Sequence, residues 1–155
     1  MKKILLRAAA LLLALVLAGC GTASPAETVP TEADKTDDNY RVFYEIFVGS
    51  FADSDGDGTG DLNGILRHLD YLNDGNLLSD TSLGVQGLWL TPIFASPSYH
   101  KYDATDYYRI DSDFGTEDDL RALLDACHAR NVKVILDLVI NHTARNHEWF
   151  QSFRQ

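Results

Sequence analysis

Four aspartates fall within one glycine-rich stretch, FADSDGDGTGDLNGI (51–65), and their spacing could serve metal chemistry. They are Asp53, Asp55, Asp57 and Asp61. Carboxylates this close together repel one another unless a hard cation lies among them, and their alternation with small residues suits Ca²⁺. The loop differs from an EF-hand, because Gly64 stands where the closing glutamate belongs and the preceding residues favour a strand over a helix. We therefore predict a Ca²⁺ loop between a strand and a helix, with the Thr59 carbonyl as a further ligand; the alternative is a solvated Asp-Gly turn.

A second stretch, TPIFASPSYHKYDATDYYRID (91–111), combines proline turns with aromatic rings, carboxylates and an imidazole. The side chains concerned are Tyr99, His100, Tyr102, Asp103, Asp106, Tyr107 and Tyr108. Sugars present apolar C–H faces and a rim of hydroxyl groups, so aromatic platforms beside carboxylates suit a sugar ligand. Aromatic side chains also serve as ordinary core, so only one or two of these tyrosines are expected to touch a ligand.

A third stretch, DLVINH (137–142), places polar side chains at the end of an apolar run. The run predicts a buried strand over Val132–Ile140, with Asp137 inside it and Asn141 and His142 at its end. A single histidine after a strand is more often structural, but here it follows an asparagine at the expected active face.

The elements that must position these three stretches alternate between strands and helices. Strands are predicted at Val42–Val48 and Val85–Leu90, ahead of the third strand already named, and a helix at Leu62–Leu72. A second helix should begin after Thr116, an N-cap residue followed by acids in the first turn. Continuous apolar strands alternating with helices indicate an α/β fold with a parallel sheet. The polar stretches then lie at the carboxyl ends of the strands, where such folds bind ligands.

The N-terminus reads as an export signal followed by a tether. Residues 1–19 have a basic head, an apolar run and small residues before Cys20, as in a bacterial lipoprotein signal peptide. We expect Cys20 to carry lipid, residues 20–39 to be disordered, and residues 40–155 to form the folded domain, exported and held at the outer side of the cell membrane. Cys127 then has no disulfide partner and is expected to be a small buried residue.

A formal net charge of −10 argues against nucleic acid as a partner, because binding to phosphates relies on basic residues. The sequence contains no P-loop and no GxGxxG motif, which argues against a nucleotide-binding sheet.

The segments GDGTGDLNGI, YDATDYYRID and DLVINH followed by TARNHEWF together resemble the N-terminal portion of the α-amylase family of glycoside hydrolases, family 13. The resemblance runs from about Tyr40 to Phe153 and has three motifs in the family's order. It implies the first three strands and two helices of a (β/α)8 barrel, in a monomeric enzyme that cleaves α-glucans or maltooligosaccharides with retention of configuration.

The resemblance also implies roles for individual residues. The aspartate loop is similar to the calcium site after the first barrel strand. Tyr102 matches the tyrosine that stacks on the sugar at subsite −1, and His142 matches a histidine that hydrogen-bonds the same sugar. Asp137 belongs to that motif in a mainly structural role, and Asn141 matches a ligand of a second calcium in many α-amylases.

Tyr99 departs from one branch of the family. Oligo-1,6-glucosidase-like members tend to have aspartate three residues before the stacking tyrosine, where it grips the terminal glucose. The tyrosine found here favours endo-acting α-amylases, with an oligo-1,6-glucosidase or α-glucosidase as the alternative.

The family's catalytic Asp, Glu and Asp follow later barrel strands, so the resemblance places them beyond Gln155 and none is assigned here. We expect a truncated and inactive piece of the enzyme, since a whole barrel takes about 250 residues. Two rival classes are an EF-hand or dockerin-like calcium module and a non-catalytic surface lipoprotein that binds calcium and sugar.

Overall fold

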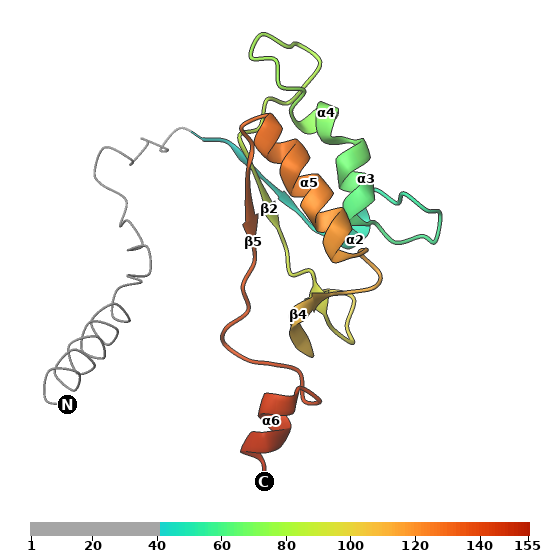
Figure 1. The fold of residues 1–155 in the computed structure, drawn as a ribbon, viewed down its shortest axis with the longest axis vertical. Coiled ribbons are helices and arrows are strands. Elements are labelled where there is room, and N and C mark those ends of the chain that lie inside the picture. The colour runs from blue at the N-terminus through green and yellow to red at the C-terminus, as the bar shows by residue number, and fades with distance from the viewer. Residues whose placement is uncertain (1–40) are drawn as a thin grey trace, which may run out of the picture. The chain divides into compact units, whose positions relative to one another are not determined.

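The computed structural model describes residues 41–155 (Figure 1). The signal peptide predicted at 1–19 and the tether predicted at 20–39, with Cys20, lie outside the described residues. Within 41–155, no helix combines the length and apolar character needed to cross a membrane.

Three parallel strands form the central sheet, as the sequence predicts. They are β1 (Phe43–Ile46), β2 (Gly87–Leu90) and β5 (Lys133–Leu136), in the spatial order β1-β2-β5. Each begins later or ends earlier than its predicted range.

The third strand shows why the ranges differ. The last residue pair between β2 and β5 joins Leu90 to Leu136, and the Asp137 N–H still donates to the Leu90 carbonyl at 2.9 Å. Beyond that point the described residues offer no neighbouring strand, so 138–140 leave the sheet although they are apolar. Asp137 therefore follows the strand, which corrects its predicted position inside it.

Helices cover one face of this sheet (Figure 1). They are α3 (Leu62–Arg67), α4 (Leu69–Leu72) and α5 (Glu117–Ala129). Ile46, Leu88 and Leu90 point toward them and are fully buried in one hydrophobic core with Ile65 and Leu123. Alternate residues of a strand face opposite sides of a sheet, so the apolar runs meet the helices with every second side chain.

The N-terminus of α5 forms as predicted. Thr116 Oγ1 accepts a hydrogen bond from the Asp119 N–H at 3.2 Å, and the Asp119 carboxylate accepts one from the Thr116 N–H at 2.8 Å. This reciprocal capping box satisfies two N–H groups that a helix start leaves without partners. Cys127 on the same helix is buried, as expected, and burial raises the pKa of its thiol to about 11.

The single helix predicted at Leu62–Leu72 is in fact two helices. The chain breaks at His68, which has φ −104° and ψ 13°. The His68 N–H donates to the carbonyls of Gly64 and Ile65, at 3.2 and 3.1 Å. Both halves keep their apolar side toward the core, with Leu62 and Leu72 buried at the two ends. The apolar spacing predicted the buried face but not the break.

Four short elements were not predicted. They are α2 (Val48–Phe51), the antiparallel hairpin of β3 (Phe94–Ala95) and β4 (Asp106–Ile110), and α6 (Glu148–Phe153). The hairpin lies within the second polar stretch, 91–111, just beyond the carboxyl end of β2, whereas α6 is the last element of the chain (Figure 1).

Candidate functional site

The three polar stretches follow the carboxyl ends of the three parallel strands, as predicted. The aspartate loop comes after β1 and α2, the hairpin segment after β2, and residues 137–142 after β5. Parallel strands bring their carboxyl ends to one edge of a sheet, so segments far apart in sequence converge there.

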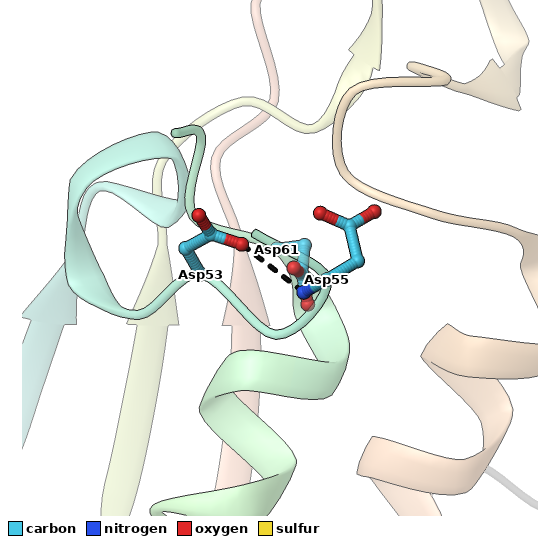
Figure 2. A group of neighbouring side chains, drawn as sticks. All are labelled: Asp53, Asp55 and Asp61. Carbon is cyan, nitrogen blue, oxygen red and sulfur yellow. Dashed lines mark hydrogen bonds between the residues drawn. The ribbon is translucent and has the colours of Figure 1, made fainter. Parts of the chain in front are cut away.

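The structure brings Asp53, Asp55 and Asp61 together in the first loop (Figure 2). One carboxylate oxygen from each lies within 4.8 Å of the other two. Oxygen ligands sit 2.3–2.6 Å from a bound Ca²⁺, so ligands on opposite sides of the ion are about 5 Å apart. These three residues therefore fit a calcium ion.

Asp57 is not part of that group. Its carboxylate accepts a hydrogen bond from the Thr59 N–H at 2.7 Å, just as Asp55 accepts one from the Asp57 N–H at 3.1 Å. These local turns, together with positive φ at Gly56 (90°) and Gly58 (92°), fold the loop back on itself.

Backbone N–H groups converge on Asp53 and Asp61. Asp53 accepts from Gly56 at 2.6 Å and from Gly58 at 2.8 Å, which lowers the pKa of its carboxyl. Burial acts to raise the pKa of Asp61, but hydrogen bonds from the N–H groups of Ser54 and Gly64, at 2.8 and 2.7 Å, lower it by more. Both carboxylates are thus held ionised.

Asp61 also serves as the N-cap of α3, through its bond from the Gly64 N–H. The loop and the helix consequently share one side chain, which fixes the last carboxylate of the group relative to α3.

The second and third stretches meet at Tyr102 and Asp137. The Tyr102 hydroxyl donates to Asp137 Oδ2 at 2.7 Å, across 35 residues of sequence. This hydrogen bond is the main reason that the pKa of Tyr102 is raised, with burial and the nearby charges of Asp137 and Glu45 acting in the same direction. The ring itself is partly exposed, so one of its surfaces can accept a ligand.

His142 lies further along the third stretch and is exposed. Its Nδ1 is 3.3 Å from Asn141 Nδ2. The hydroxyl of Tyr107 on β4 lies 2.7 Å from the Val139 carbonyl and 2.9 Å from the His142 carbonyl, so it shares its proton between them. Tyr107 was counted among possible sugar contacts, and here it ties the third stretch to the hairpin.

Sequence reasoning overlooked Lys101. This lysine is buried next to Tyr102, with Nζ 3.0 Å from Asp111 Oδ1 and 2.8 Å from Asp113 Oδ2. Its sequence signal is slight: it is the only lysine or arginine between Thr91 and Tyr108, in a stretch rich in acids and tyrosines.

Comparison with known proteins agrees with this geometry. The family model for the α-amylase catalytic domain matches residues 45–155. The chain belongs to the α-amylase family.

Similarity extends to several members of this family. The chain is 52% identical over 111 residues to α-amylase 3 of Dictyoglomus thermophilum, covering 72% of this chain and 21% of that protein. It is 44% identical over 115 residues to an oligo-1,6-glucosidase of Heyndrickxia coagulans, covering 74% of this chain and 19% of that protein. The crystal structure of an α-amylase from H. orenii superimposes with a TM-score of 0.69 at 60% identity, covering 70% of this chain and 22% of that one.

The chain thus spans about a fifth of the length of the curated relatives it matches. As a member of the α-amylase family, it carries the N-terminal part of a (β/α)8 barrel: β1, β2 and β5 are barrel strands, and α3 and α5 lie outside them.

Proposed function

We propose that this chain forms the sugar-binding start of a hydrolase that cleaves α-glucosidic bonds of starch-type glucans with retention. The observation that carries the proposal is the Tyr102–Asp137 hydrogen bond, which joins the segments after β2 and β5 inside the part of the chain that matches the family.

In this proposal Tyr102 supplies a flat face to the sugar at subsite −1. Asp137 holds the phenol hydroxyl, so the ring cannot turn away when a sugar stacks on it. His142 donates a hydrogen bond to the same sugar. Retaining cleavage also needs two carboxyl groups about 5 to 5.5 Å apart. By the family resemblance these follow residue 155, so we propose that the 155-residue chain alone is inactive.

Calcium is part of the proposal. Asp53, Asp55 and Asp61 would hold the ion, with the Thr59 carbonyl as a further ligand, while a second ion at Asn141 would need ligands from elsewhere. The ion would neutralise the clustered carboxylates and stiffen the connection from β1 to α3.

We also propose an exported, monomeric protein anchored by lipid at Cys20, on the strength of the sequence of residues 1–20. Mass spectrometry of the mature N-terminus tests the anchor: a processed chain that starts beyond Cys20 and carries no lipid would rule it out.

The catalytic proposal is tested in a complete barrel, with residues 41–155 in place of the matching segment of the H. orenii α-amylase. This chimera should hydrolyse starch and release the α-anomer. Tyr102→Ala should lower kcat/KM on the order of 100-fold, because the sugar loses its stacking face and its alignment.

Tyr71→Ala is the matched control, since Tyr71 is a half-exposed tyrosine on α4, away from the carboxyl ends of the strands. A folded chimera without activity, or equal losses from the two tyrosine variants, would overturn the proposal.

An oligo-1,6-glucosidase is the second candidate, favoured by the relative from Heyndrickxia coagulans. Against it stands Tyr99, an exposed ring packed edge-to-face on Phe47 with centroids 6.3 Å apart, where an aspartate would grip a terminal glucose. The chimera should accordingly prefer maltoheptaose to isomaltose. A non-catalytic lipoprotein would instead bind maltooligosaccharide without cleaving it.

A further inference from the structure

Both neighbours of Tyr102 have side chains that are anchored inside the hairpin segment. Lys101 is 4% exposed and forms ion pairs with Asp111 and Asp113, at 3.0 and 2.8 Å. Its Nζ also lies 5.2 Å from the ring centroid of buried Phe114. On the other side of Tyr102, Asp103 accepts hydrogen bonds from the hydroxyls of Ser96, at 2.8 Å, and Ser98.

Asp111 connects the two anchors. Its Oδ1 pairs with Lys101, and its Oδ2 accepts the Ser96 N–H at 2.9 Å. Ser96 in turn donates its hydroxyl to Asp103. These contacts form a closed circuit that runs from Lys101 to Asp111, Ser96 and Asp103. The backbone of Tyr102 completes the circuit, because Tyr102 stands between Lys101 and Asp103 in the sequence.

The backbone at Lys101 needs such support. Its φ is 62°, a left-handed conformation that L-residues with a Cβ disfavour. A buried ammonium group is also costly unless it is paired. Burial acts to lower the pKa of Lys101, but the hydrogen bonds that its ammonium group donates to Asp113 and Asp111 raise the pKa by more, so the group stays charged.

We propose that Lys101 is a positioning residue for sugar binding: its ion pair with Asp111 fixes the turn that presents Tyr102 to Asp137 and to the sugar. The sugar-binding part rests on the proposed function, whereas the placement of Tyr102 can be tested without it. A buried ion pair that only stabilised the hairpin would leave the Tyr102 hydrogen bond unchanged when it is replaced.

The first experiment measures the pKa of Tyr102 in the full chain by NMR of Cζ-labelled tyrosine. The chain has seven tyrosines, and Tyr102→Phe identifies the signal. Asp137 and Glu45 act on the pKa of Tyr102, and the His100 ring lies 6.0 Å from the Tyr102 ring, centroid to centroid. In the parent, the hydrogen bond to Asp137 keeps the Tyr102 pKa above its ordinary value of 10.0.

Lys101→Met should lower the pKa of Tyr102 toward 10.0, because the ring leaves Asp137. The sign is diagnostic, since removing a nearby positive charge without any movement would raise this pKa. The double variant Lys101→Met with Asp111→Asn, which leaves no unpaired buried carboxylate at Asp111, should behave in the same way even if the single variant folds poorly.

Two controls accompany the titration. Burial raises the pKa of Tyr107, which has no contact with Lys101 among the hydrogen bonds and ion pairs described, and this pKa should not change. Arg121→Met removes a positive charge from the exposed Arg121–Glu117 pair on α5 and should leave Tyr102 as in the parent. An unchanged or raised Tyr102 pKa in the folded double variant would overturn the proposal.

The second experiment is a mutant cycle in the chimera described above. The double variant at Lys101 and Asp111 should lower kcat/KM on the order of 10- to 100-fold, as a misplaced binding group does. In a Tyr102→Ala background the same change should add less than about twofold, because both act through one ring. If the two losses of kcat/KM instead multiply in the combined variant, Lys101 acts independently of Tyr102, and the proposal is overturned.

Failure of the proposed function gives a different result. In that case the chimera is inactive or indifferent to Tyr102→Ala, while the Tyr102 titration in the full chain still decides whether Lys101 positions the ring.

Discussion

Asp55 and Asp57 make a matched pair at the scale of single residues. Both carboxylates are exposed and each accepts one N–H two residues ahead, but only Asp55 lies in the group with Asp53 and Asp61. Asparagine keeps the acceptor of the turn at either position and removes one negative charge. Asp55→Asn should therefore weaken Ca²⁺ binding about tenfold or more, and Asp57→Asn less than about threefold.

Calorimetry with Ca²⁺ measures both affinities, and Mg²⁺ serves as the comparison ion, because its small octahedral shell suits a flexible oxygen cage less well. Equal losses in the two variants would contradict the three-residue group. No loss in either would count against a metal site in this loop.

Asp61 is a poor choice for the same test, because it both joins the carboxylate group and caps α3. Its depressed pKa also sets a pH limit. A carboxyl whose folded pKa lies below the unfolded value near 3.8 contributes its stability above that value and loses it as pH falls through the folded pKa. The cap and the charge of Asp61 should thus persist at mildly acidic pH.

At the scale of elements, Gly64 shows how the loop packs against α3. A Cβ on Gly64 would lie 1.9 Å from the Ala52 carbonyl oxygen, so the first turn of α3 closes against the backbone that enters the aspartate loop. In an open helix, alanine is favoured over glycine by about 1 kcal/mol. At Gly64 we expect alanine to destabilise the protein relative to glycine.

Gly64→Ala should lower the free energy of unfolding by about 1–3 kcal/mol, because the clash is with backbone and cannot be relieved by a rotamer change. Urea unfolding followed by circular dichroism measures this. Asp125→Ala, at an exposed position on α5, should stay within about 0.5 kcal/mol of the parent. A stabilised Gly64→Ala chain would show that this close approach is absent.

The elements also show which features are readable from sequence. The N-cap at Thr116 was predicted from the sequence, since a capping box involves only residues three positions apart. The end of β5 at Leu136 was missed because it depends on pairing with β2, which is distant in sequence. The break at His68 was also missed, and nothing in the structure explains it. Tyr102 and Asp137 were each singled out, but their direct pairing requires the geometry of two different loops.

The burial of Lys101 is the feature that was hardest to predict from the sequence. A lysine in a polar loop is ordinarily a solvated residue. Its burial depends on Asp111 and Asp113, ten and twelve positions later, which the β3–β4 hairpin folds back upon it.

At the scale of the whole molecule, the sheet has two unlike faces. Its helix-covered face is the core, whereas on the opposite face Phe43, Trp89 and Ile135 follow the strand alternation and remain 41–46% exposed. Trp89 pairs in register with Ile135, so their side chains form one continuous apolar surface. In a (β/α)8 barrel, that face is the interior, packed by side chains from all the strands.

This open face should drive self-association of the 155-residue chain. Trp89 is 41% and Ile135 46% exposed, whereas Leu77 and Leu78 are more exposed, at 99% and 92%, but lie in the loop between α4 and β2. Replacing the first pair, by Trp89→Gln with Ile135→Thr, should reduce both oligomer formation in sedimentation velocity and binding of a hydrophobic dye. Leu77→Ser with Leu78→Ser should change neither by much, because scattered apolar side chains bury little area on association. If the leucine variant abolishes self-association and the sheet variant does not, the loop mediates self-association and the open sheet face does not.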